Sequence, residues 1–142
     1  MAVPQNPEGK DRRKNPRADA AFSVVYKVKS PFEVILEVGR NEFDSIAEDI
    51  AIGGIAVISN EVIPPKTIVG LSFKMFNEKA TIKADGYRSF ELTAETRYLV
   101  PWSKEGSRIG LQFMDATPED VRFIAAYILD NALREDKDFK IT

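Results

Sequence analysis

Short runs in which apolar and polar residues alternate occupy most of the chain from residue 21 to residue 113. The runs lie near residues 22–29, 33–38, 43–50, 55–59, 67–75, 92–98 and 108–113. A period of two is typical of half-buried antiparallel strands, and turn residues such as Gly39 and Pro64 separate the runs. Six to eight strands at this spacing predict a small barrel or sandwich, and we expect an all-β fold with an antiparallel β-barrel of about six strands.

A different pattern near the C-terminus predicts a helix. Thr117 can cap it, Pro118 suits its first position, and Asp120 stands where a capping-box acid reaches back. Apolar residues then recur at helical spacing at positions 121, 124, 125, 128, 129 and 132. We therefore predict one α-helix over residues 117–134 that packs its apolar stripe against the barrel, followed by a charged, frayed tail over residues 136–142.

The N-terminal segment, residues 1–19, contains three prolines, and its only sizeable apolar side chains are Met1 and Val3. Such a segment cannot bury enough apolar surface to order itself. We predict a flexible arm over residues 1–19 and one domain, the β-barrel with its helix, over residues 20–135. The basic residues of the arm outnumber its three acidic ones and are Lys10, Arg12, Arg13, Lys14 and Arg17.

The composition of the whole chain narrows its chemistry. The 142 residues include no Cys and no His, which excludes disulfides, thiolate or imidazole zinc sites and nucleophiles that depend on histidine. With 20 basic and 22 acidic residues, the net charge of −2 provides no general positive field for binding DNA or RNA. The polar N-terminus and the lack of a long apolar window predict a cytoplasmic protein without a membrane span.

No catalytic signature stands out in the sequence, so we predict a protein that is not an enzyme and needs no cofactor. An acidic cluster could hold Mg²⁺ or provide a carboxylate pair, but it lacks the spacing of a ligand loop, and we predict no metal site. The members of this cluster are Glu42, Asp44, Glu48 and Asp49. Trp102 could stack on a base or cover the mouth of the barrel.

A first candidate binding motif lies in the arm, where Arg13 and Arg17 are four residues apart. Arginine forms bidentate hydrogen bonds with a phosphate or with O6 and N7 of guanine, and it also stacks on aromatic rings. The plain alternative is a solvated basic tail or the start of a localisation signal.

A second candidate motif runs from Asp49 to Gly54, between two predicted strands. Asp49 could accept hydrogen bonds from N1 and N2 of guanine, while Gly53 and Gly54 would permit a close approach to the backbone. The alternative is an ordinary β-turn in which Asp49 is a turn residue.

Together and in this order, the two motifs resemble those of the PilZ domain family, which binds the bacterial second messenger cyclic di-GMP. The family signatures are RxxxR in an N-terminal loop and [D/N]xSxxG on a following strand turn. Here they correspond to Arg13 and Arg17, then to Asp49 and Gly54. The resemblance covers roughly residues 10–132, because the last predicted strand followed by a single helix also fits the family.

The resemblance implies a receptor for cyclic di-GMP that works as a switch. Arg13, Arg17 and Asp49 would hold the ligand, and Arg12 would add a phosphate contact. The arm would wrap the nucleotide and become ordered, which alters the surface offered to an unidentified downstream protein. The implied roles are control of motility, exopolysaccharide synthesis or virulence, by a monomer or a homodimer.

Ala51 departs from the family pattern, which has serine at this position. The missing hydroxyl removes one hydrogen bond, worth about 0.5–1.5 kcal/mol, so we predict weakened binding. The same departure suits a divergent PilZ-like adaptor that binds no nucleotide and acts by protein contact. A third class, a barrel that binds single-stranded nucleic acid, would need a basic groove interleaved with aromatics, whereas the basic residues concentrate in the arm.

Overall fold

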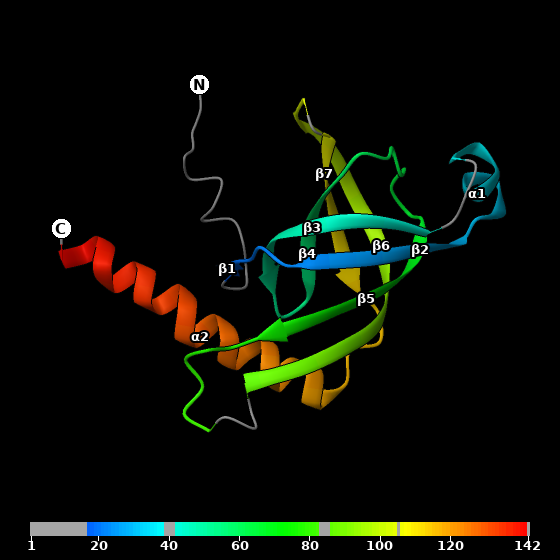
Figure 1. The fold of residues 1–142 in the computed structure, drawn as a ribbon. Helices are drawn as coiled ribbons and strands as arrows, with labels where there is room; N and C mark the ends of the chain where they lie inside the picture. The colour runs from blue at the N-terminus through cyan, green and yellow to red at the C-terminus, as the bar shows by residue number, and fades with distance from the viewer. Residues whose placement is uncertain (1–16, 39–41, 83–85, 105, 142) are drawn as a thin grey trace.

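The computed structural model describes residues 17–38, 42–82, 86–104 and 106–141, and Figure 1 shows how they are arranged. The elements in chain order are β1 (Arg17–Asp19), β2 (Ser23–Ser30), α1 (Phe32–Val38), β3 (Glu42–Ala51), β4 (Gly54–Ser59), β5 (Ile68–Phe76), β6 (Tyr87–Ser103), β7 (Gly106–Phe113) and α2 (Pro118–Ile141). Seven strands and two helices therefore make up the described part of the chain.

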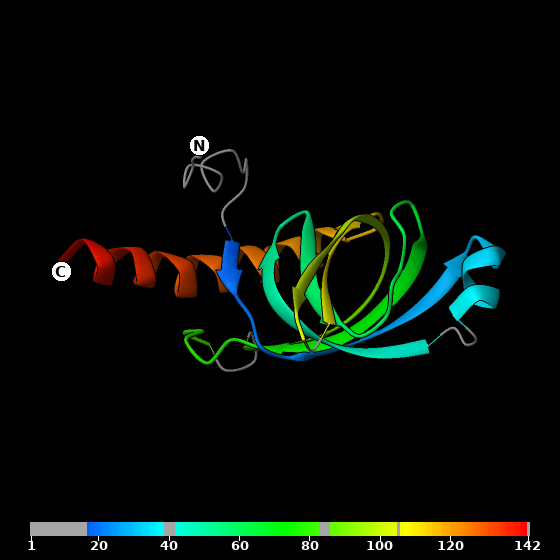
Figure 2. The same ribbon diagram turned by 90° about the horizontal axis from the view of Figure 1, so that it is seen from above.

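Six of the strands close into an antiparallel barrel (Figures 1 and 2). Hydrogen-bonded neighbours follow the order β3, β2, β5, β6, β7 and β4, and β4 pairs back onto β3. Apolar side chains alternate inward along these strands and form the core inside the barrel. The predicted all-β barrel of about six strands with a C-terminal helix is confirmed.

The short strand β1 lies beside the last three residues of β3, with Arg17 opposite Ala51. The Ala20 N–H then donates to the carbonyl oxygen of Glu48 at 2.9 Å, so the chain follows one edge of β3 from β1 into β2. The last three residues of the predicted flexible arm are therefore a strand, because the edge of β3 offers them backbone partners. The rest of that arm, residues 1–16, lies outside the described residues.

One predicted strand is wrong, because residues 33–38 belong to the helix α1. Val34 is buried, and Ile35 and Val38 pack beside it against the core. Positions 34 and 38 share a face in a helix and in a strand alike, so a run this short does not distinguish the two periods before the burial of Ile35 is known. The Val34 N–H donates to the carbonyl oxygen of Pro31 at 3.1 Å at the start of the helix.

The helix α2 begins at the predicted capping box. The Thr117 N–H donates to Asp120 Oδ2 at 3.0 Å, and the Asp120 N–H donates to Thr117 Oγ1 at 3.1 Å. The other end differs from the prediction of a helix to Arg134 and a frayed tail over 136–142, because α2 continues to Ile141. No glycine or proline interrupts this charged segment, which therefore retains helix propensity after the apolar stripe ends.

The face of α2 that packs on the barrel is offset from the predicted stripe. The side chains that pack there are Phe123, Ile124, Tyr127 and Ile128. Leu129, which we predicted to be packed, is 57% exposed. Because α2 contacts β1 and β3, and Tyr127 Oη donates to the carbonyl oxygen of Asp19 at 3.2 Å, the helix helps to hold β1 in place. Figure 2 shows the C-terminal part of α2 projecting beyond the barrel.

Candidate functional site

A shallow pocket of about 280 Å³ lies on the outer face of the barrel, where β1, β3, β4, β7 and β6 are paired in that order. Two rows of directly paired residues cross these strands. The first row is Arg17, Ala51, Gly54 and Gln112, and the second is Asp49, Ala56, Gly110 and Tyr98. In each row the middle residues are small and the end residues are large, so the surface is hollow between them.

Two glycines of these rows cannot be replaced without a clash. A Cβ on Gly54 would overlap the carbonyl oxygen of Leu111 on the next strand. A Cβ on Gly110 would overlap the ring of Tyr98, which lies against that glycine. Gly54 thus allows the strands to pair closely, and Gly110 makes room for an aromatic ring at the edge of the pocket.

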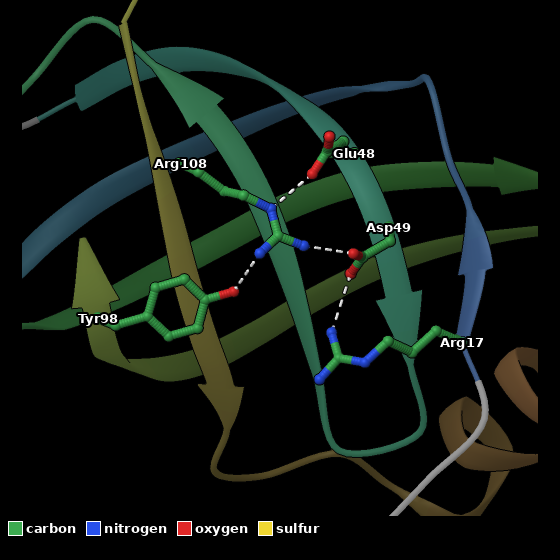
Figure 3. Close-up of polar contacts among 5 residues, drawn as sticks. All are labelled: Arg17, Glu48, Asp49, Tyr98 and Arg108. Carbon is green, nitrogen blue, oxygen red and sulfur yellow. Dashed lines mark hydrogen bonds and ion pairs between the residues drawn. The ribbon is translucent and has the colours of Figure 1, made fainter. Parts of the chain in front are cut away.

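Four of the residues predicted to bind a ligand line this pocket together: Arg17, Ala51, Gly53 and Gly54. Asp49 joins them, because Arg17 Nη1 donates to Asp49 Oδ1 at 3.2 Å (Figure 3). The structure therefore brings the second arginine of the first motif into contact with the aspartate of the second motif. Arg12 and Arg13 lie outside the described residues, and their roles stay predictions.

Arg17 has unused hydrogen-bonding capacity. Its Nε is buried and has no hydrogen-bond partner among the described residues, although the side chain as a whole is 32% exposed. A buried donor without a partner costs free energy, so a ligand that accepts from Nε would recover part of that cost.

Arg108 on β7 is the central charged residue beside the pocket, and the sequence analysis missed it. Arg108 Nε donates to Glu48 at 2.5 Å, Nη2 to Asp49 at 2.5 Å and Nη1 to Tyr98 Oη at 2.7 Å (Figure 3). Its guanidinium also lies 5.6 Å from the ring centre of Trp102. A residue on one strand thus connects β3 with β6.

The environment of Arg108 keeps it a cation. Burial of the guanidinium opposes its charge, but the hydrogen bond to Glu48 and the nearby Tyr98 and Asp49 outweigh that effect and raise the pKa of Arg108. Asp49, which is only 8% exposed, therefore faces a permanent positive charge on one side and Arg17 on the other.

Tyr98 lies on the outer face of the barrel, whereas strict alternation over the predicted run 92–98 would place it on the inner face with Leu92 and Thr96. The register of β6 against β7 shifts between Thr96 and Tyr98. This bulge reverses the alternation, so Leu99 packs toward the core and Tyr98 turns to the pocket. The available sequence signal for the bulge was Leu99, an apolar residue where continued alternation from Leu92 would place a polar one. In the bulge, Arg97 Nη1 donates to Gln112 Oε1 at 2.7 Å.

The acidic cluster of the sequence does not gather around a cation site. Glu48 and Asp49 are both hydrogen-bonded to Arg108, and Asp44 is exposed. In the part of the chain that the structure describes, no three His, Cys, Asp or Glu side chains come together in a way that could hold a metal ion. Within the same residues, no helix has both the length and the apolar character needed to cross a membrane.

Comparison with known families identifies the class of protein. The PilZ domain model matches residues 11–130, so the chain belongs to the PilZ domain family. PilZ domains are non-catalytic receptors for cyclic di-GMP. The match covers the arm motif, the barrel and the packed part of α2. No curated protein matches the sequence.

Solved structures with a similar fold include three bacterial proteins. The Bacillus subtilis inhibitor of motility, MotI/DgrA, has a TM-score of 0.67 and 19% identity, over 87% of this chain and 52% of that one. The MrkH–cyclic di-GMP complex from K. pneumonia has a TM-score of 0.58 and 16% identity, over 89% of this chain and 55% of that one. The PilZ domain of Escherichia coli YcgR with cyclic di-GMP has a TM-score of 0.56 and 14% identity, over 92% of this chain and 99% of that one. The chain thus spans about half the length of the first two and almost all of the third.

Proposed function

We propose that this protein binds cyclic di-GMP in the pocket beside Arg17 and Asp49, and that binding changes the position of its N-terminal arm and signals to a partner protein. The observation that carries the proposal is the contact between Arg17 and Asp49 beside a pocket lined by Ala51, Gly53 and Gly54. It supports the correspondence with both family motifs.

The chemistry of the pocket suits a guanine base. The Asp49 carboxylate can accept from the N1 and N2 donors of guanine, and Arg17 can donate to O6 and N7 or to a phosphate. Gly53 and Gly54 leave the backbone of the β3–β4 turn accessible to the ligand. A neutral or acidic side chain at position 17 could not donate to these guanine or phosphate acceptors as a cation.

The charges and size of the pocket make the arm part of the proposal. The charges of the described side chains that form ion pairs around it balance, with three arginines and three acids: Arg17, Arg97, Arg108, Glu48, Asp49 and Glu95. A dianionic ligand therefore requires further cations, which Arg12 and Arg13 would supply. The volume of about 280 Å³ lies at the lower end for small-molecule sites, so part of the ligand would contact the arm.

The arm would then act as the moving part. Engagement of its arginines by guanine and phosphate would draw residues 1–16 onto the outer face of the barrel and present a new surface to the partner. The similarity to the inhibitor of motility from B. subtilis makes motility one process to examine, along with exopolysaccharide synthesis and virulence.

Calorimetric titration of the full chain with cyclic di-GMP tests the proposal. We expect wild type to bind, and Arg13→Ala and Arg17→Ala each to weaken binding by about tenfold or more, because each removes charge-assisted hydrogen bonds. Arg122→Ala is the matched control, since Arg122 is exposed on α2 and pairs only with Glu119 among the described residues. Unchanged affinity in both arm variants would place the ligand elsewhere.

A PilZ-like adaptor that binds no nucleotide is the second candidate, and Ala51 is the observation that favours it. Ala51 lines the pocket where the family motif has serine, so one ligand hydrogen bond is missing. Absence of binding heat for wild type at high micromolar cyclic di-GMP would contradict the receptor and support the adaptor. Binding that is merely weak agrees with the loss of a single neutral hydrogen bond.

A further inference from the structure

Two arginines hold the Asp49 carboxylate, and they differ in how firmly they are fixed. The Arg17 side chain is 32% exposed and donates one hydrogen bond of 3.2 Å to Asp49. The Arg108 side chain is 13% exposed, and all three of its nitrogens donate, one each to Glu48, Asp49 and Tyr98. The partners of Arg108 come from two strands on opposite sides of β7 and β4 (Figure 3).

From this asymmetry we propose that Arg108 is a positioning residue of the nucleotide site, which fixes the plane of the Asp49 carboxylate and thereby sets the preference for guanine. The inference rests on the proposed function and adds a residue that neither family motif contains. Arg108 acts through Asp49, and Glu48 in turn holds Arg108.

The two oxygens of Asp49 then have different tasks. Arg108 holds Oδ2, and Arg17 holds Oδ1. Because each carboxylate oxygen has two lone pairs, Oδ2 can accept from Arg108 and from a ligand donor together. Arg17 is the partner that a guanine edge displaces, and its guanidinium then becomes free to contact the ligand. The carboxylate keeps its orientation during this exchange, since Arg108 does not leave.

A fixed carboxylate discriminates between purines. Guanine presents two adjacent donors, N1–H and the 2-amino group, to Asp49, whereas adenine presents an acceptor at N1 and no 2-amino group. A site whose buried polar group must be hydrogen-bonded rejects the analogue that lacks the donors. Without Arg108, the carboxylate of Asp49 would turn and pair with Arg17 through both oxygens, which withdraws both groups from the ligand.

The test compares the affinity of the 142-residue chain for cyclic di-GMP with its affinity for cyclic di-AMP. Trp102 is the only tryptophan of the chain and lies beside the Arg108 guanidinium, so its fluorescence reports on this network. We expect Arg108→Gln to lose about tenfold or more in affinity for cyclic di-GMP and to lose most of the guanine preference. Arg108→Lys should recover part of both, because it restores one charged donor. Arg122→Gln is the control.

A second variant separates positioning from folding. Glu48→Gln keeps Arg108 and Asp49 but removes the negative charge that accepts from Arg108 Nε. The Glu48 side chain does not line the pocket. We expect it to unfold at nearly the wild-type temperature, to bind cyclic di-GMP about two- to fivefold more weakly and to shift the guanine preference in the same direction as Arg108→Gln. Wild-type guanine preference retained in Arg108→Gln, or in Glu48→Gln if the former does not fold, would overturn the role of Arg108. Failure of wild type to bind would overturn the proposed function itself.

Discussion

Two buried aspartates, Asp49 and Asp120, are each paired with an arginine that is distant in the sequence, yet we propose a ligand-binding role for Asp49 alone. Asp49 is 8% exposed and Asp120 is 6% exposed. Arg108 on β7 holds the first, and Arg88 on β6 holds the second. What differs between them is the second partner of each carboxylate.

One of the two partners of the Asp120 carboxylate is a backbone group that belongs to the cap of α2. Arg88 Nε donates to Oδ1 at 2.9 Å, and the Thr117 N–H donates to Oδ2 at 3.0 Å as part of the α2 cap. The second partner of Asp49 is the side chain of Arg17, which lines a pocket, whereas Arg88 does not line it. A buried acid becomes a binding group when one of its partners can be exchanged for a ligand.

The largest effect is expected from Asp49→Ala. It removes the shared partner of Arg17 and Arg108 and leaves the less exposed Arg108 without one of its acceptors. We expect the free energy of unfolding to fall by about 3 kcal/mol and cyclic di-GMP binding to disappear. Urea unfolding and calorimetry measure the two effects. If affinity survived within threefold, Asp49 would be structural like Asp120, and the comparison would fail.

Asp120→Ala should be the next largest change, and it should affect stability alone. It removes the capping box of α2 and the acceptor of Arg88, so we expect a loss of about 2 kcal/mol in the free energy of unfolding. Affinity for cyclic di-GMP should match wild type, because Asp120 lies apart from the pocket. A change of more than threefold in affinity at equal folded fraction would show that the two regions are coupled.

The pH dependence of stability sharpens the role of Asp120. Burial opposes ionisation of its carboxyl, but the hydrogen bonds from Thr117 and Arg88 outweigh burial and lower the pKa of Asp120 from its ordinary value of 3.8. A depressed pKa in the folded state means that the stabilisation is complete above the unfolded value and is lost as pH falls through the folded value. The stability gap between wild type and Asp120→Asn, followed by urea unfolding, should therefore be constant at neutral pH and narrow below about pH 4. A gap that widens in acid would contradict this account.

The smallest expected effect comes from Ala51→Ser, which adds the hydroxyl of the family motif to the pocket beside Arg17 and Asp49. Residue 51 lies opposite Arg17 and lines the pocket. One neutral hydrogen bond predicts binding about 2- to 13-fold tighter, with little change in the unfolding temperature. Unaltered or weaker binding in calorimetry would mean that the ligand does not reach residue 51.

The parts of the fold that follow local patterns could be predicted from the sequence. Alternation located the strands of the barrel, and the capping box located the start of α2. Prediction failed where two periods fit one short run, as in α1, and where a bulge reversed the alternation before Tyr98. Local sequence decides neither outcome by itself: Leu99 hints at the bulge, but packing against distant strands selects it.

The candidate site divides in the same way. Arg17, Asp49 and the glycines could be found because they form two recognisable motifs with characteristic spacing. The role of Arg108 could not, since this residue begins the last predicted strand, lies 60 residues from Glu48 and 59 from Asp49, and belongs to neither binding motif. Only the order of strands in the closed barrel places β7 beside β4 and one strand away from β3, which lets this side chain reach the acids across β4.

The claim that Asp49 reads a guanine edge can be tested most directly by removing one donor from the ligand and the acceptor charge from the protein. Wild type and Asp49→Asn are titrated with cyclic di-GMP and with cyclic di-inosine monophosphate, which lacks the 2-amino group. We expect wild type to lose about tenfold or more on removal of that group and Asp49→Asn to lose little, because the charged acceptor is already gone. An equal loss in both proteins would contradict the assignment of Asp49.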